Sequence, residues 1–184
     1  MITTLRIIHQ ITSGSFQDTR TGYGHIKKES RLKLSENFSL KEMTRSQVAI
    51  RKGIKNAPDS EQLVSLAVLA TKILQPCREQ FGSISINSGL RVLELNRAIG
   101  SGDKSQHCKG EAADFEAYSI SNRRLAEWVE GHLEFDQLIL EYPGSDPRDG
   151  WVHCSYKRDG GNRKQVLTAV KEGSKTIYKK GLKE

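Results

Sequence analysis

The sequence feature that most constrains the fold is a switch in apolar spacing midway through the chain. Upstream of it, apolar residues recur at the spacing of a helix, at Leu63, Leu66, Ala67, Ala70, Ile73, Leu74 and Cys77. Asp59 and Gln62 offer a capping box at the start of this helix. Downstream, Ser83–Asn87 alternates polar and apolar residues, so Ile84 and Ile86 are expected to point into the core from a strand.

The rest of the chain continues this mixture of helices and strands. Strands are expected at Glu111–Glu116, Gln137–Tyr142 and Trp151–Tyr156, and a helix capped by Ser121 is expected to carry Leu125, Trp128 and Val129 on one face. These elements interleave without the regular strand–helix–strand rhythm of a parallel sheet. We therefore predict an α+β fold with a small antiparallel sheet flanked by helices.

The predicted elements mark out one domain at residues 34–156. Residues 1–33 show no sustained apolar period and are expected to form a poorly ordered N-terminal arm. Residues 157–184 are expected to form a basic C-terminal tail, in which the pattern allows a short helix around Gln165–Lys171. A length of 184 residues suits one domain with terminal extensions.

Charge and composition exclude several classes of protein. The net charge of +7 favours anionic surroundings, but the basic tail has few interleaved aromatic residues, so nucleic-acid binding is not expected. No stretch approaches the ~18 consecutive apolar residues of a membrane helix. Arg6 and His9 interrupt the first apolar residues, so we expect synthesis in the cytoplasm without a clear export signal. The three cysteines lack C-x-x-C spacing, which favours reduced thiols that pack in the core.

Three side chains have the types and spacing of a catalytic zinc site. Such sites commonly use three protein ligands and keep a fourth position open. His107 lies in a loop, Asp114 lies on a strand beyond a glycine turn, and His153 lies in the middle of the late strand. Alternation places His153 on the face opposite Val152 and Cys154. Spacing alone leaves open a simpler hypothesis, in which the histidines make ordinary hydrogen bonds and Asp114 is a strand-end acid.

Three motifs in order along the chain resemble a known family. Residues 105–114 match the pattern S-x-H-x-x-G-x-A-x-D, W-V-H follows at 151–153, and S-G-L-R at 88–91 is similar to an S-G-Y-R element. Together they resemble the zinc D-Ala-D-Ala carboxypeptidases and related phage endolysin peptidases over residues 34–156. This resemblance implies the Hedgehog/DD-peptidase fold, one Zn²⁺ held by His107, Asp114 and His153, and hydrolysis of peptide bonds in peptidoglycan stem peptides.

The resemblance does not fix the general base. Many members carry an acid three residues before the last histidine, where this chain has Gly150. We favour Glu141, because Q-L-I-L-E followed by W-V-H resembles one branch of the family that keeps this glutamate. Alternation also puts its carboxylate at a strand end, where it can overhang a metal held by the next strand. Asp149 is the alternative base.

Arg91 and Ser105 are the predicted substrate-binding residues. The planar guanidinium of Arg91 suits bidentate capture of a substrate carboxylate, and either residue can hold negative charge that develops in the reaction.

We therefore expect a zinc metallopeptidase that acts on the bacterial cell wall, as a carboxypeptidase or an endopeptidase. A phage or prophage lysin fits a chain without a clear export signal. The alternative is a non-catalytic zinc-containing module for cell-wall binding or morphogenesis, which the missing acid at Gly150 would suit. The expected partner is the stem peptide, with neither nucleic acid nor membrane, and the chain is expected to be a monomer.

Overall fold

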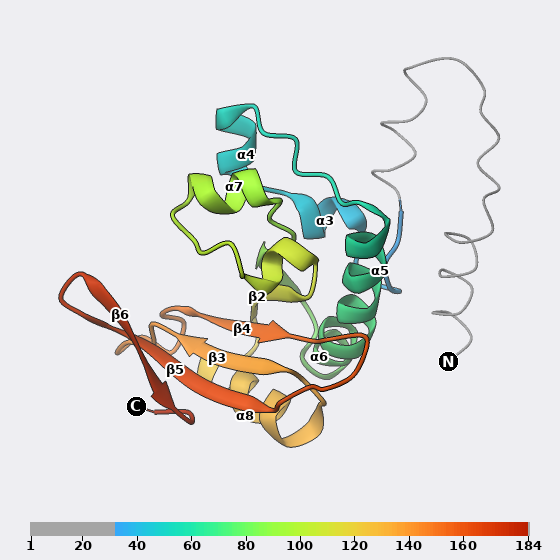
Figure 1. The fold of residues 1–184 in the computed structure, drawn as a ribbon. Coiled ribbons are helices and arrows are strands. Elements are labelled where there is room, and N and C mark those ends of the chain that lie inside the picture. Colours follow the sequence, from blue (N-terminus) through green and yellow to red (C-terminus); the bar gives the residue numbers. More distant parts are fainter. Residues whose placement is uncertain (1–31, 184) are drawn as a thin grey trace, which may run out of the picture.

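The structure is a computed structural model that describes residues 32–183, so nearly all of the arm expected at 1–33 lies outside the described residues. Its helices are α3 (Leu40–Thr44), α4 (Gln47–Lys52), α5 (Ser60–Leu69), the π turn η1 (Ala70–Leu74), α6 (Gln75–Phe81), α7 (Leu93–Ala98), the 3-10 turn η2 (Gln106–Lys109) and α8 (Asn122–His132). Its strands are β1 (Ile84–Ser88), β2 (Ala112–Ala117), β3 (Gln137–Glu141), β4 (Trp151–Ser155), β5 (Gln165–Glu172) and β6 (Lys175–Lys180). They form a six-stranded sheet in the order β1-β2-β4-β3-β5-β6 (Figure 1). Among the described helices, none has both the length and the apolar character that a bilayer crossing requires.

The long helical segment begins with the predicted capping box. Asp59 accepts a hydrogen bond from the backbone of Gln62 at 2.8 Å, and Gln62 accepts one from the backbone of Asp59 at 2.8 Å. Helix α5 continues through η1 into α6, and the wide π turn comes just before Pro76. Proline has no N–H to donate to the helical ladder, so an irregular turn beside it is expected.

The sheet has an apolar face and a polar face because its strands alternate. Val152 and Cys154 of β4 and Phe115 of β2 are fully buried in one core with side chains of α5, η1, α6 and α8. Asp114 and His153 alternate with these residues and are partners across the antiparallel pair β2–β4. The predicted orientation of His153 is therefore confirmed, and it shares its face of the sheet with Asp114.

The C-terminal segment differs from the prediction. A short helix around Gln165–Lys171 is wrong, because these residues belong to β5, which pairs in parallel with β3 and is followed by β6. The run Q-V-L-T-A-V contains β-branched residues that suit a strand, and the edge of β3 supplies hydrogen-bond partners that a short isolated helix lacks. The α+β class is confirmed, but the sheet is mixed rather than purely antiparallel. The Hedgehog/DD-peptidase name stays a prediction.

Asp136 anchors the connection between β4 and β5. Its buried carboxylate accepts hydrogen bonds from Nε and Nη2 of Arg163 at 2.8 and 2.6 Å, and Nζ of Lys157 lies at 3.0 Å. Burial would raise the pKa of Asp136, but the hydrogen bonds from Arg163 and Lys157 outweigh burial and hold this pKa below its usual range. These contacts fix the chain that leads into β5.

Two of the three cysteines have the packing role that the sequence predicts. Cys77, Cys108 and Cys154 are free, and Cys77 and Cys154 are buried. Burial raises the pKa of the Cys77 thiol to about 12. This thiol is therefore a neutral packing group at physiological pH.

Candidate metal centre

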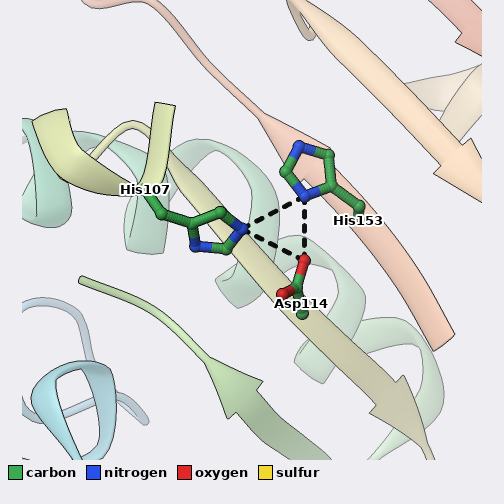
Figure 2. Close-up of side chains that lie close together, drawn as sticks. All are labelled: His107, Asp114 and His153. Carbon is green, nitrogen blue, oxygen red and sulfur yellow. Dashed lines mark hydrogen bonds and ion pairs between the residues drawn. The ribbon is translucent and has the colours of Figure 1, made fainter. Parts of the chain in front are cut away.

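Three buried side chains converge on one point above the polar face of the sheet. Nε2 of His107 lies 3.2 Å from Oδ1 of Asp114 and 3.3 Å from Nδ1 of His153, and the last two atoms are 2.8 Å apart (Figure 2). Among the described residues, His107, Asp114 and His153 form the group whose ligand atoms lie close enough together to share a metal ion. The structure thus brings together the three residues that the sequence predicts as ligands.

Backbone pairing positions two of the three. Asp114 on β2 and His153 on β4 are direct cross-strand partners, so their side chains leave the sheet side by side. His107 comes from η2, which ends at Gly110 with a φ of +70°. A Cβ at Gly110 would lie 2.7 Å from the carbonyl oxygen of Gln62, so both the turn and the contact with α5 require glycine. The glycine of the S-x-H-x-x-G pattern therefore holds the loop histidine over the sheet.

A backbone carbonyl fixes which nitrogen of His107 faces the centre. Nδ1 of His107 lies 2.7 Å from the carbonyl oxygen of Gly89, which can only accept, so Nδ1 carries the proton. Gly89 is itself pressed against α3, because a Cβ there would lie 2.3 Å from the carbonyl oxygen of Met43. The neutral imidazole consequently presents the lone pair of Nε2 to Asp114 and His153. A hydrogen bond from the second ring nitrogen to a backbone carbonyl orients a metal-binding histidine in this way.

The sequence did not reveal this role of Gly89. Its motif marks the position, but nothing local shows that its carbonyl faces His107. Asn56 was also missed: its amide donates at 2.8 Å to the carbonyls of Thr44 and Leu90 and accepts from the backbone of Val92 at 3.0 Å. No local pattern identifies Asn56, because each of its three hydrogen-bond partners lies at least 12 residues away in the sequence.

The electrostatics of the trio suit a cation. Burial lowers the pKa of His107, which favours the neutral imidazole. Burial alone would raise the pKa of Asp114, but the adjacent ring nitrogens of His107 and His153 bring it below its usual range. With Nδ1 protonated, Nε2 of His107 turns a lone pair toward a carboxylate oxygen at 3.2 Å, and a cation bound between the two atoms would stabilise both.

The spacing of the three atoms fits zinc. Ligand atoms held at about 2.0–2.1 Å from one ion in tetrahedral geometry lie about 3.3 Å apart. The three observed separations, 3.2, 3.3 and 2.8 Å, are close to this value. Two imidazoles and one carboxylate also form a ligand set that leaves a fourth position for water or substrate.

Arg91 lies beside the trio with unused donors. Its Nη1 is 3.9 Å from Oδ2 of Asp114, and its side chain is 18% exposed. Nε of Arg91 and Nε1 of Trp151 are buried and have no hydrogen-bond partner among residues 32–183. Ser105 precedes η2 without capping it through its side chain. The contact with Asp114 places Arg91, one of the two predicted substrate-binding residues, within reach of the centre.

The two predicted bases lie in different surroundings. Glu141 ends β3 as the cross-strand partner of Trp151 and is half-buried. Burial raises the pKa of Glu141, the charge of Asp114 raises it further, and His153 opposes this, so Glu141 lies within electrostatic reach of the centre. Asp149 is exposed, and its carboxylate accepts a hydrogen bond from the backbone of Asp146 in its own turn at 3.1 Å.

Gly150 explains the missing acid. Its φ is +73°, and a Cβ there would lie 1.7 Å from the carbonyl oxygen of Glu141. The backbone of this loop packs so closely on the end of β3 that no side chain fits. A carboxylate three residues before His153 is therefore incompatible with this loop.

The chemistry of this centre is that of the peptidases that use a single metal ion: two imidazoles and a carboxylate would hold the ion, and an acid and a guanidinium lie close by. The family model described as peptidase M15 matches residues 36–155, and the chain belongs to this family. Comparison with curated proteins gives no match. The M15 family consists of metallopeptidases that are typically zinc-dependent, and His107, Asp114 and His153 form a donor set that fits this metal.

Proposed function

We propose that this chain is a zinc-dependent hydrolase of peptide bonds in peptidoglycan stem peptides, acting as a D-Ala-D-Ala carboxypeptidase or an endopeptidase of the phage-lysin type. The observation that carries the proposal is the convergence of Nε2 of His107, Oδ1 of Asp114 and Nδ1 of His153 at near-tetrahedral spacing. The peptidoglycan substrate is supported by the resemblance of the three motifs and by family membership. The net charge of +7 suits an anionic cell wall. We also propose that the chain is made in the cytoplasm and released onto the wall.

Each residue near the centre has a defined task in this proposal. Zinc, when bound, supplies Lewis acidity and lowers the pKa of a bound water toward ~7. Glu141 accepts a proton from the attacking water and delivers it to the leaving amine, a step typically worth ~10²–10⁴-fold. Arg91 donates from its guanidinium to a substrate carboxylate or to the developing oxyanion, as its unpartnered Nε permits. Ser105 is a further candidate donor to the substrate.

Glu141 is the better base for two reasons. A raised pKa brings a carboxyl group closer to the range in which it both accepts and returns a proton near neutral pH. The alternative, Asp149, already accepts a hydrogen bond within its own exposed turn. We therefore assign the proton transfer to Glu141.

Zinc content and peptidoglycan digestion by the full-length chain test the proposal together. Wild type is expected to bind one zinc and to release fragments of purified peptidoglycan that mass spectrometry identifies as products of one stem-peptide bond. Glu141→Gln should retain zinc and lose at least about 100-fold in kcat. Asp149→Asn, the matched control, should keep its activity.

Two outcomes would redirect the interpretation. Full zinc occupancy without cleavage of any muropeptide would contradict the hydrolase and favour a non-catalytic cell-wall module. Loss of activity in Asp149→Asn with retention in Glu141→Gln would reverse the assignment of the base. Size-exclusion chromatography of the zinc-loaded chain tests the proposed monomer.

A further inference from the structure

We propose that the hairpin β5–β6 carries a substrate subsite that binds a carboxylate-bearing segment of the peptide several residues away from the scissile bond. This inference rests on the proposed peptidase function. The hairpin lies C-terminal to residues 36–155, the part that matches the family model, yet it extends the sheet that holds the metal centre (Figure 1). The register of the strand pairing decides which side chains of the hairpin lie on the same face of the sheet as His153.

Continuous strand pairing extends the face of the sheet on which His153 lies from β4 across β3 and β5 to β6. Trp151 pairs with Glu141, Glu141 with Ala169, and Ala169 with Tyr178. Residues that pair directly across a sheet point to the same side, and every second residue along a strand returns to it. The side chains of the hairpin on the side of the metal centre, here called the hairpin face, are therefore Leu167, Ala169, Lys171, Thr176, Tyr178 and Lys180.

Tyr178 gives the hairpin face an exposed aromatic surface beside the proposed base. Its side chain is 56% exposed, although its cross-strand partner Ala169 is buried. Partial burial raises the pKa of Tyr178, and the charge of Glu141 adds to the effect, which places the two side chains in the same electrostatic environment. A tyrosine at this position offers both a flat contact surface and a hydroxyl to a passing peptide.

Tyr142 fixes the hairpin relative to the centre. It directly follows Glu141 with a φ of +53°, an uncommon conformation for a bulky residue, which indicates that its surroundings hold it. Its hydroxyl lies 3.0 Å from Oγ1 of Thr176, and its ring packs at 5.4 Å against Trp151. The hairpin face, Glu141 and Trp151 are thus parts of one connected surface.

The charged side chains of the hairpin face itself are both lysines. On the hairpin face, Nζ of Lys171 lies 3.0 Å from Oγ1 of Thr176 and 5.1 Å from the centre of the Tyr142 ring. Among residues 32–183, neither Lys171 nor Lys180 has a carboxylate within ion-pair distance. On the opposite side of the hairpin, Lys179 is paired with Glu172 at 3.6 Å. Two uncompensated ammonium groups therefore point to the side from which a peptide reaches the metal centre, and they favour an anionic segment.

The geometry sets how far from the scissile bond this segment lies. Two strand-to-strand steps of about 4.8 Å separate β4 from β5 and three separate it from β6, so the hairpin face lies about 10–14 Å across the sheet from β4 and the metal centre. An extended peptide covers this distance in about four residues. Lys180 pairs with Leu167 and Lys171 lies four residues further along β5, about 13 Å away, so a second carboxylate of a stem peptide at the metal centre can reach one of the two ammonium groups.

The test measures binding separately from turnover. The probes are a synthetic stem pentapeptide whose D-glutamate keeps its free α-carboxylate and the same peptide with that carboxylate amidated. Their Kd values are measured by titration calorimetry on the zinc-loaded, full-length Glu141→Gln protein, with and without Lys171→Gln plus Lys180→Gln. One solvent-exposed ion pair with either lysine is expected to give the free acid about a threefold loss of affinity in the double variant. The amidated peptide should change by less than about twofold.

A matched control separates a local subsite from overall charge. Lys175→Gln plus Lys179→Gln removes the same charge from the opposite side of the same hairpin and should leave both Kd values unchanged. Tyr178→Ala should weaken both peptides. The subsite is refuted if the two double variants lose equally, if both peptides lose equally in Lys171→Gln plus Lys180→Gln, or if neither peptide binds. Failure of wild type to hydrolyse any stem peptide would instead overturn the proposed function, while the Kd comparison still decides the subsite.

Discussion

Replacing Gly150 with alanine is predicted to destabilise the chain by about 3 kcal/mol and to impair catalysis. Gly150 has a φ of +73°, where a residue with a Cβ costs about 1–2 kcal/mol. The new Cβ would lie 1.7 Å from the carbonyl oxygen of Glu141 and 2.8 Å from that of Tyr142. Both neighbours are backbone atoms that cannot rotate away, so the loop or the end of β3 must move, at a further cost of about 1–3 kcal/mol.

This movement should reach the proposed base. The carbonyl that the Cβ would strike belongs to Glu141 itself, and relieving the overlap needs a shift of roughly 1 Å. A misplacement of about 1 Å at a catalytic group costs on the order of 100-fold in rate. Urea unfolding measures the stability of Gly150→Ala, and kcat on stem-peptide substrate, with zinc content checked by mass spectrometry, measures its activity.

Gly53→Ala is the matched control. Gly53 has a similar φ of +66°, but a Cβ there would have no atom within 4 Å. It should cost about 1–2 kcal/mol and leave kcat unchanged. If Gly150→Ala lost no more stability than Gly53→Ala and kept its kcat, the inference that the loop presses on Glu141 would be refuted.

Three further predictions concern charge and metal. Asp136→Asn should lower the free energy of unfolding by about 2–3 kcal/mol at pH 7, because it breaks a buried ion pair whose cations remain partly solvated. The pKa of Asp136 is depressed in the folded state, so its ion pairs contribute fully to the free energy of unfolding above the ordinary aspartate pKa of about 3.9. This contribution is lost as the pH falls through the pKa of Asp136 in the folded state. The urea midpoints of wild type and Asp136→Asn should therefore converge below about pH 4. Because burial raises the pKa of Glu141 and a base must be deprotonated, kcat/KM should fall on the acid side through a pKa above the ordinary glutamate value of about 4.3; a limb at or below that value in the pH profile would contradict the assignment. Removal of zinc by a chelator should abolish hydrolysis and lower Tm, and added zinc should restore both. For zinc present at 1,000 times its Kd, the lost stabilisation is about 4 kcal/mol. An unchanged Tm would argue against His107, Asp114 and His153 as the binding site.

Local patterns predicted those parts of the fold that local physics decides. The capping box at Asp59 and the N-cap at Ser121 are confirmed, because a cap depends on residues only three positions apart. Alternation in β4 correctly separated His153 from Val152 and Cys154. The candidate trio followed from the same alternation together with the spacing of His107 and Asp114 around a glycine turn.

Features that depend on pairing between distant segments were missed. The residues of β5 satisfy helical spacing as well as strand spacing over one or two turns, and only the edge of β3 decides between them. The carbonyl of Gly89 and the buried contact of Asp136 with Arg163 likewise exist only after separate segments have packed. The sequence contains the donor and the acceptor in each case, but it does not show that folding brings them together.

The metal centre depends both on local sequence patterns and on contacts between distant segments. The separation of Asp114 and His153 is set by the pairing of β2 with β4, and alternation within each strand predicts only the face on which each side chain lies. His107 has no such partner, so its position depends on long-range contacts: Gly89 orients its ring, and the amide of Gln62 holds η2 to α5 by donating to the carbonyl of Cys108 at 2.8 Å. The loop histidine is thus the ligand whose placement depends most on tertiary packing. Changes in the contacts around η2 should therefore affect metal affinity before they affect the sheet, whereas changes on the hairpin face should affect the substrate and leave the metal in place.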